Sequence, residues 1–351
     1  MNNEKKHPEH KNKTGQSLPL FNDPQRLKRY GCALVMILLM TGIAGIIHEK
    51  EVLFPEMAAL TIGMWIVDKR VWQVTDLQLI LLMTICACAG VLIVRYSPFP
   101  LEVNVAAAFL FAGINLHLTR SSLFPVISAC VLPVLLTTES WVYPVSVLIM
   151  TCILIAVRRW MENRGIRQKI TYEPSERHWR TDIQRWLYLT ASVFVVASVS
   201  IYTTGTYLII PPLLVTYVEF VNSRSGFRNR PLLTMLLLVA GSLTGTLLQL
   251  IGYYYLEIPE TIVAFFILIT LFTLFEWLGK FFAPVGAMAL IPMLLPREAL
   301  PGLPFQVLAG ATIFITLGMV FFQQCYKWTR AQLIYCLIPH YLINRLHRNK
   351  E

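Results

Sequence analysis

The stretch Phe282-Ala-Pro-Val-Gly-Ala-Met-Ala-Leu-Ile-Pro-Met-Leu-Leu295 is apolar throughout, yet it has only 14 residues. As an α-helix it would extend about 21 Å, whereas the hydrocarbon core of a bilayer is about 30 Å thick. Prolines at positions 284 and 292 also interrupt helical hydrogen bonding. The stretch is therefore suited to a membrane but is not an ordinary spanning helix.

The same pattern occurs earlier in the chain, as Leu123-Phe-Pro-Val-Ile-Ser-Ala-Cys-Val-Leu-Pro-Val-Leu-Leu136. Two prolines, a Leu-Leu pair and a glutamate correspond at a constant offset of 159 residues, so that Pro125 matches Pro284 and Glu139 matches Glu298. Self-similarity at a fixed offset predicts a tandem repeat.

The composition is that of an integral membrane protein with an all-α transmembrane bundle. The chain has 351 residues, of which 56% are hydrophobic and 14% charged, and its mean hydropathy is +0.58. The net charge of +10 comes mostly from three polar segments, one at each end and one in the middle. The positive-inside rule explains this distribution, so we expect a lipid bilayer as partner and no nucleic acid.

Each half of the chain contains six hydrophobic segments. Those of the first half cover 31–47, 52–67, 77–94, 101–118, 124–136 and 141–157, and those of the second cover 186–203, 206–221, 231–250, 261–279, 282–295 and 305–322. Six crossings per half give the halves the same orientation, which is the parallel type of repeat. If either short segment is re-entrant, this inference fails.

The predicted organisation has five parts: a flexible cytoplasmic tail (1–30), a first transmembrane repeat (31–157), a basic cytoplasmic linker (158–185), a second repeat (186–323) and a basic amphipathic cytoplasmic tail (324–351). With both termini in the cytoplasm, most basic loops lie on that side, and Lys50, Arg95 and Arg297 lie outside. We expect a multi-pass protein of the plasma (inner) membrane. Homo-oligomerisation is left open.

Motifs for chemistry are missing from the sequence. The seven cysteines have no paired metal-ligand spacing, and there is no nucleotide-binding loop, no His-Glu-x-x-His and no nucleophile elbow. We therefore expect no enzyme, no disulfide, no metal and no cofactor. A lipid-modifying enzyme would need more polar side chains clustered at one membrane face.

Three motifs of the second half carry a resemblance, namely Ile210-Pro211-Pro212, Gly241-Ser-Leu-Thr-Gly245 and Phe282-Ala-Pro-Val-Gly-Ala287. In this order they resemble the Leu-Pro-Pro segment, the Gly-rich helix and the His-Pro-Pro-Ala-Gly-Ala segment of the HPP family of integral membrane proteins. The resemblance implies a solute transporter, and chloroplast members are linked to nitrite movement. The name-giving histidine is Phe282 here and one of the two prolines is Ala283, so the resemblance does not specify the substrate.

Proline breaks predict a central site. Backbone groups freed by proline must be satisfied by protein or by a water-lined cavity, so paired broken helices converge on one. Their positive N-termini would suit an anion. We expect Pro284 and Gly286 to face Pro125 and Ser128 between the halves; the alternative is that the prolines form packed kinks. The breaks are at Pro55, Pro125, Pro211, Pro212 and Pro284.

Ionisable residues within the apolar segments are further candidates, since charge at membrane depth is costly. Glu56 follows a helix-breaking proline, whereas Glu219 lies near the end of its segment and alternatively reaches the surface. His117 corresponds to Glu276 at the offset of 159, so the two meet near the axis or occupy equivalent places. Either they carry a proton or they anchor helix ends.

These features predict a transporter or channel for a small anionic solute, with a site at the membrane midplane between the repeats. The alternative is a scaffold or accessory subunit that transports nothing, in which the proline segments only pack.

Overall fold

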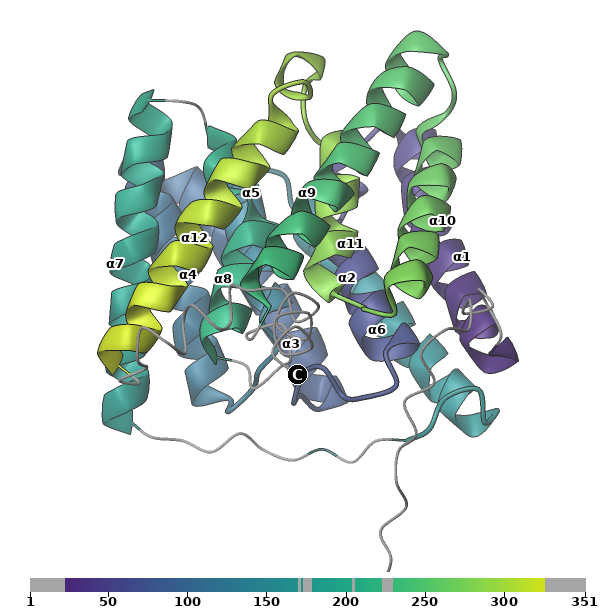
Figure 1. The fold of residues 1–351 in the computed structure, drawn as a ribbon, viewed down its shortest axis with the longest axis horizontal. Helices are drawn as coiled ribbons and strands as arrows, with labels where there is room; N and C mark the ends of the chain where they lie inside the picture. Colours follow the sequence, from purple (N-terminus) through teal and green to yellow (C-terminus); the bar gives the residue numbers. More distant parts are fainter. Residues whose placement is uncertain (1–22, 170–171, 173–178, 204–205, 223–229, 326–351) are drawn as a thin grey trace, which may run out of the picture.

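The computed structural model describes residues 23–169, 172, 179–203, 206–222 and 230–325, and all of its regular elements are helices (Figure 1). Eight of them are long and apolar enough to cross a membrane, as expected of a multi-pass membrane protein. The long helices are α1 (Pro24–Ile47), α3 (Asp76–Tyr96), α4 (Leu101–Leu118), α6 (Val142–Asn163), α7 (Trp179–Thr203), α9 (Pro231–Leu248), α10 (Glu260–Leu278) and α12 (Leu303–Cys325).

Four shorter helices fall on the proline-broken segments. Two are continued by π or 3-10 turns, and none exceeds about 18 Å at 1.5 Å per residue. They are α2 (Glu56–Thr61) with η2 (Ile62–Ile66), α5 (Pro125–Leu135), α8 (Pro211–Asn222), and α11 (Ala283–Leu290) with η5 (Ile291–Met293). The remaining turns are η1 (Lys50–Val52), η3 (Thr206–Ile209), η4 (Gln249–Tyr255) and η6 (Arg297–Ala299).

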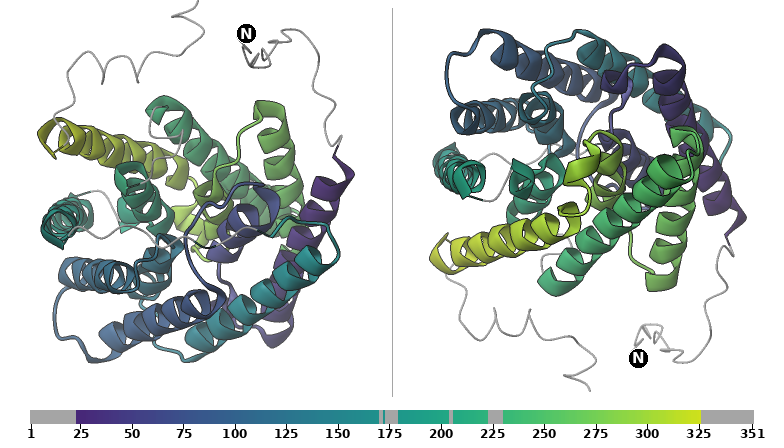
Figure 2. Two further views of the ribbon diagram at one scale, coloured as in Figure 1. Left: turned by 90° about the horizontal axis from the view of Figure 1, so that it is seen from below. Right: turned by 90° about the horizontal axis from the view of Figure 1, so that it is seen from above.

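The short helices form the centre of the bundle. Each packs on two others in a closed order, α2 on α11, α11 on α8, α8 on α5 and α5 on α2. Nearly all of their residues are buried. Their labels lie between α7 and α1 in Figure 1, and Figure 2 shows those two long helices at opposite sides of the molecule. The unpaired backbone N–H and C=O groups at the ends of the short helices, which lipid could not hydrogen-bond, are thereby enclosed by protein.

Long helices from distant parts of the sequence cover this centre. α1 packs on α10, and α7 packs on α4. α3 packs on α5 and α6, while α9 packs on α11 and α12. We call the end of the bundle at which α1 begins the N-terminal face. The end of α6 also lies there, because Arg167, just after α6, donates to the Val67 carbonyl, and Arg29 of α1 donates to the adjacent Ile66 carbonyl. The start of α3 joins them, since Arg158 and Arg159 pair with Asp76.

Three segment boundaries differ clearly from the sequence predictions. The first helix begins at Pro24, within the predicted tail, because Asp23 accepts a hydrogen bond from the Gln25 amide and proline suits the first helical turn. α6 continues to Asn163 and α7 begins at Trp179, so both ends of the predicted linker are helical. The predicted amphipathic segment after residue 325 lies outside the described residues.

Two glycines allow the closest approaches of long helices to short ones. A Cβ atom at Gly90 of α3 would lie 2.3 Å from the Cys130 carbonyl oxygen of α5. At Gly245 of α9 it would lie 2.1 Å from the Ala289 carbonyl oxygen of α11. These are small-residue contacts of the kind that membrane helices use to pack.

Substituting Gly245 or Gly90 by alanine should destabilise the bundle by about 1–3 kcal/mol, because the added methyl group would force two backbones apart. The measurement is the midpoint of thermal unfolding in detergent. Gly31→Ala is the matched control, since a Cβ atom there meets nothing within 4 Å. Equal midpoints for all three variants would contradict this account of the packing.

Candidate functional site

A buried carboxyl group lies at the start of the first short helix. Glu56 opens α2 directly after Pro55 and is 1% exposed. Its Oε1 atom accepts a hydrogen bond from the hydroxyl of Ser128 in α5, which is fully buried. Its Oε2 atom has no hydrogen-bond partner among the described residues. Buried polar atoms are normally satisfied, so this oxygen is available to a proton, a water molecule or a polar ligand.

The pair lies well inside the bundle. The backbone amide of Phe54, two residues before Glu56, is 3.3 Å from the sulfur of Met40. Met40 precedes the end of α1 at Ile47 by about 10 Å of helix. The chain between α1 and α2 thus turns back into the interior before the short helix starts.

The start of α11 meets α2 rather than α5. A Cβ atom at Gly286 would lie 2.5 Å from Ile62 Cδ1 and 3.1 Å from the Ala58 carbonyl carbon. The expectation that Pro284 and Gly286 face Pro125 and Ser128 therefore has to be corrected, because α5 packs on α8 and α2 instead. Glu56 links α5 to the pair formed by α2 and α11, because it belongs to α2 and its side chain accepts a hydrogen bond from Ser128 of α5.

Glu219 on α8 is buried rather than extended to the surface. It is 8% exposed, and its Oε1 atom accepts a 2.8 Å hydrogen bond from the indole nitrogen of Trp72. Trp72 lies in the connection between η2 and α3, and Pro211 and Pro212 begin the helix that carries Glu219. In the sequence, the only signal for Trp72 is a tryptophan next to apolar segments, whose N–H needs a partner once it is buried.

His117 and Glu276 occupy separate helix pairs. His117 Nδ1 on α4 is 3.6 Å from Asp182 Oδ2 on α7. Glu276 Oε1 on α10 accepts a 2.7 Å hydrogen bond from the Tyr30 hydroxyl and lies 3.5 Å from Arg26 Nη1, both on α1. Each residue thus joins two helices that are distant in sequence. In the first pair the basic side chain is on α4 and the acidic one on α7, whereas in the second pair the acidic side chain is on α10 and the basic one on α1.

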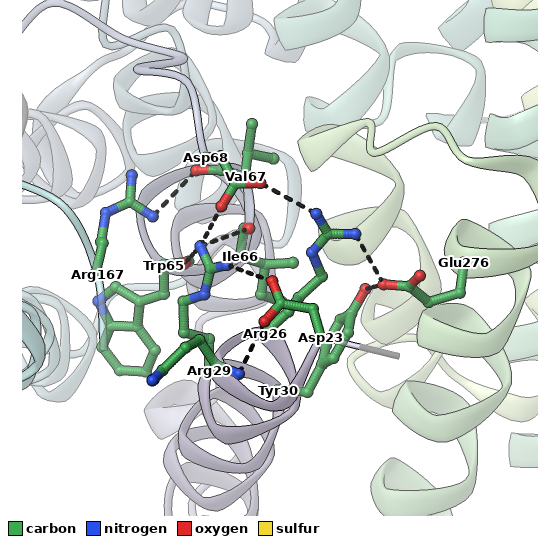
Figure 3. A network of polar contacts seen from close by, with 11 residues as sticks. Asp23, Arg26, Arg29, Tyr30, Trp65, Ile66, Val67, Asp68, Arg167 and Glu276 are labelled. Atoms are coloured by element: carbon green, nitrogen blue, oxygen red, sulfur yellow. Dashed lines mark hydrogen bonds and ion pairs between the residues drawn. The ribbon is translucent and has the colours of Figure 1, made fainter. Parts of the chain in front are cut away.

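A polar network at the N-terminal face holds the end of η2 (Figure 3). Arg29 of α1 is 4% exposed and donates to the carbonyls of Trp65 and Ile66 at 3.3 and 3.2 Å. Arg167, which follows α6, donates to the Val67 carbonyl at 3.0 Å. Cations at the carbonyl end of a helix are favourable. The end of this short helix is therefore fixed by arginines from two other elements.

Asp68 balances part of this positive charge. Its carboxylate lies 2.6 Å from Arg29 Nη1 and 3.1 Å from Arg26 Nη2. Burial by itself raises the pKa of Asp68, but the hydrogen bond and charge of Arg29 and the charge of Arg26 outweigh it, so the pKa is lowered. Asp68 is accordingly ionised near neutral pH, and Arg26 connects it to Glu276.

A metal site does not form in the described part of the chain, where no three His, Cys, Asp or Glu side chains gather closely enough to hold an ion. Comparison with known protein families, curated proteins and solved structures finds no match to this chain. Its function must therefore be inferred from the geometry of the buried carboxyl groups.

Replacing Trp72 by phenylalanine should destabilise the protein by about 1–3 kcal/mol, because the Glu219 carboxyl group would lose its hydrogen-bond donor. The same replacement should cost clearly less in a Glu219→Leu background, where no acceptor remains. Thermal unfolding of the two single variants and the double variant gives the coupling free energy. Purely additive effects would show that the hydrogen bond contributes nothing.

Proposed function

We propose that the chain is a multi-pass membrane transporter or channel for a small anionic solute. The observation that carries the proposal is Glu56, a carboxyl group 1% exposed with one oxygen unpaired among the described residues, at the centre of a membrane bundle. Ionisable groups at this depth are expensive and mark solute or proton pathways. Its place at the start of a broken helix is the arrangement found at midplane sites of secondary transporters.

The role proposed for Glu56 is to exchange a proton in step with the solute. A protonated Glu56 leaves the surrounding helix starts without a negative charge, so an anion is attracted; an ionised Glu56 repels it. Ser128 serves either state because a hydroxyl group both donates and accepts. The proposed substrate-contacting residues are those of the short helices, namely Pro55, Pro125, Pro211, Pro212, Glu219, Pro284 and Gly286, while His117 and Glu276 are proposed to carry protons near the N-terminal face.

The transport cycle is proposed to expose the midplane alternately through movement of two parallel repeats. Two pairs of equivalent contacts support such a repeat. Gly90 approaches the Cys130 carbonyl and Pro133 as Gly245 approaches the Ala289 carbonyl and Pro292. His117 meets α7 as Glu276 meets α1, and these two residues are again 159 positions apart. Membership of the HPP family, suggested by the motif residues, is part of the same proposal.

A plasma membrane location with cytoplasmic termini completes this proposal. The N-terminal face gathers the buried Arg29 and Arg167 and the half-buried Arg70 and Arg158, as the positive-inside rule expects of a cytoplasmic face.

The second candidate function is a scaffold or accessory subunit that moves no solute. Close packing favours it: Gly286 leaves no room for a side chain between α11 and α2, and Gly245 leaves none between α9 and α11. A rigid centre of this kind would need no movement between repeats.

Uptake into proteoliposomes separates the two candidates. We expect flux of a small anion that rises when the source side is acidified, and at least a tenfold loss in Glu56→Gln because its side chain no longer releases a proton. Glu298→Gln is the control, since Glu298 is exposed and should keep wild-type flux. A protein that is folded but carries no small anion in either orientation would exclude transport.

The orientation of the repeats is tested by labelling Glu139→Cys and Glu298→Cys with a membrane-impermeant thiol reagent in intact cells. Both positions are exposed at corresponding places after the short helices α5 and α11. We expect both to react from outside, above the labelling of the parent protein. Reaction from opposite sides would overturn the parallel arrangement.

A further inference from the structure

The N-terminal face contains a pocket of about 730 Å³ between the start of α3, the end of α6 and the segment that follows each of η2 and α6. Its volume is that of a site for a small organic molecule rather than for a lone ion. Gly63 and Met64 of η2 line its inner side, and Trp72 and Tyr172 add aromatic surface.

Charge in the pocket is strongly unbalanced. Among the residues that the structure describes, five cationic side chains line it together with two acidic ones, so the cations outnumber the acids by three. The cations are Arg70, Arg158, Arg159, Arg167 and Lys169, and the acids are Asp76 and Glu162.

Asp76 is already shared between two of the arginines. One of its oxygens binds Arg158 and the other lies 2.8 Å from Arg159 Nε, while Glu162 lies 3.4 Å from Arg158 Nε. Arg167 donates to the Val67 carbonyl at 3.0 Å, and Arg70 donates to the carbonyls of Trp72, at 3.2 Å, and of Val74. A carbonyl orients a guanidinium group and leaves it cationic.

The pKa values of these two arginines are both lowered, chiefly because the groups are buried. Burial, followed by the charges of Arg29 and Arg158, lowers the pKa of Arg167 to about 10. Burial and the charge of Arg158 also lower the pKa of Arg70. Both groups are thus less stable as cations than they would be in water, and a bound anion would favour their charged form.

The inner wall of the pocket leads to a buried carboxyl group. Trp72 is 3% exposed, lines the pocket, and donates its indole hydrogen to Glu219 of α8. Its ring packs so closely on η2 that a Cβ atom at Gly63 would lie 2.5 Å from it. Trp72 therefore separates the pocket from the central short helices.

We propose that this pocket binds an organic anion carrying a phosphate or carboxylate group, held by Arg70 and Arg167, with Trp72 as the wall between it and the centre of the bundle. The planar guanidinium group matches both oxyanions. The role of the pocket as an entrance for the transported solute rests on the proposed function. Its role as a binding site can be tested without measuring transport.

The test is isothermal titration of the purified full chain in detergent with phenyl phosphate, compared with sodium sulfate at the same ionic strength. We expect saturable binding of phenyl phosphate, weakened at least tenfold in Arg70→Gln and in Arg167→Gln. Arg95→Gln is the matched control, because Arg95 also donates to a backbone carbonyl and lies over an aromatic ring, at Glu139 and Trp141. It lies outside the pocket and should leave binding unchanged.

Two further variants guard against misfolding. Arg167→Lys keeps the buried charge and should retain measurable binding, and Arg159→Gln changes a side chain that is 65% exposed. Arg159→Gln should weaken binding without lowering the unfolding midpoint. Absence of saturable binding, or equal binding in Arg70→Gln and Arg95→Gln, would overturn the proposal.

A second arm identifies the source of the anion. The titration is repeated in nanodiscs of phosphatidylcholine with and without phosphatidylglycerol. Loss of phenyl phosphate binding only with phosphatidylglycerol would assign the site to a lipid headgroup and overturn the entrance. Binding that resists the anionic lipid supports a soluble anion. If phenyl phosphate binds but no anion is transported, the transport proposal is excluded and the binding site remains. If transport is unaffected by Arg70→Gln, only the role of the pocket as an entrance is excluded.

Discussion

Backbone hydrogen bonding without water is the constraint on which this bundle depends. Four helices stop or start inside the membrane region, and lipid cannot satisfy the amide and carbonyl groups that they leave free. The structure meets this constraint by placing α2, α5, α8 and α11 against one another and surrounding them with eight long helices. The buried polar contacts follow from it: Ser128 and Glu56 meet where two short helices come together, and Arg29 and Arg167 hold the carbonyls at the end of η2.

The residues that let helix backbones approach one another closely are different from those that make polar contacts. Gly90, Gly245 and Gly286 let backbones touch, so the centre is dense where it is apolar. Other side chains make the polar contacts between elements, such as Ser128 with Glu56 and Trp72 with Glu219. Glu56 matters most for function, because it is polar, central and only half satisfied among the described residues. A dense surround with this incompletely bonded carboxyl group is compatible with small movements and a small ligand.

Much of this architecture could be predicted from the sequence. Proline marked the four broken segments that form the short helices, of which two were also too short to span the membrane, and proline lies at the start of α5, α8 and α11. Pairing could not be predicted, because periodicity does not say which distant helix a face will meet. Gly286 was therefore assigned to the wrong neighbour, and Trp72 was missed because its partner Glu219 lies 147 residues later in the chain. The cap at Asp23 has a local signal, an aspartate directly before a proline, but it lies within a polar segment that resembles a flexible tail.

The pairing of α1 with α10 has a consequence for synthesis. α1 ends at Ile47 and its partner ends at Leu278, so more than two hundred residues must be translated before the contact between Tyr30 and Glu276 can form. At about 5–20 residues per second, this interval is roughly 10–50 s. During that time α1 is in the bilayer with Arg26 and Arg29 near its start and no α10 beside it. During biogenesis there is therefore an interval in which the face of α1 that later packs on α10 is without that partner.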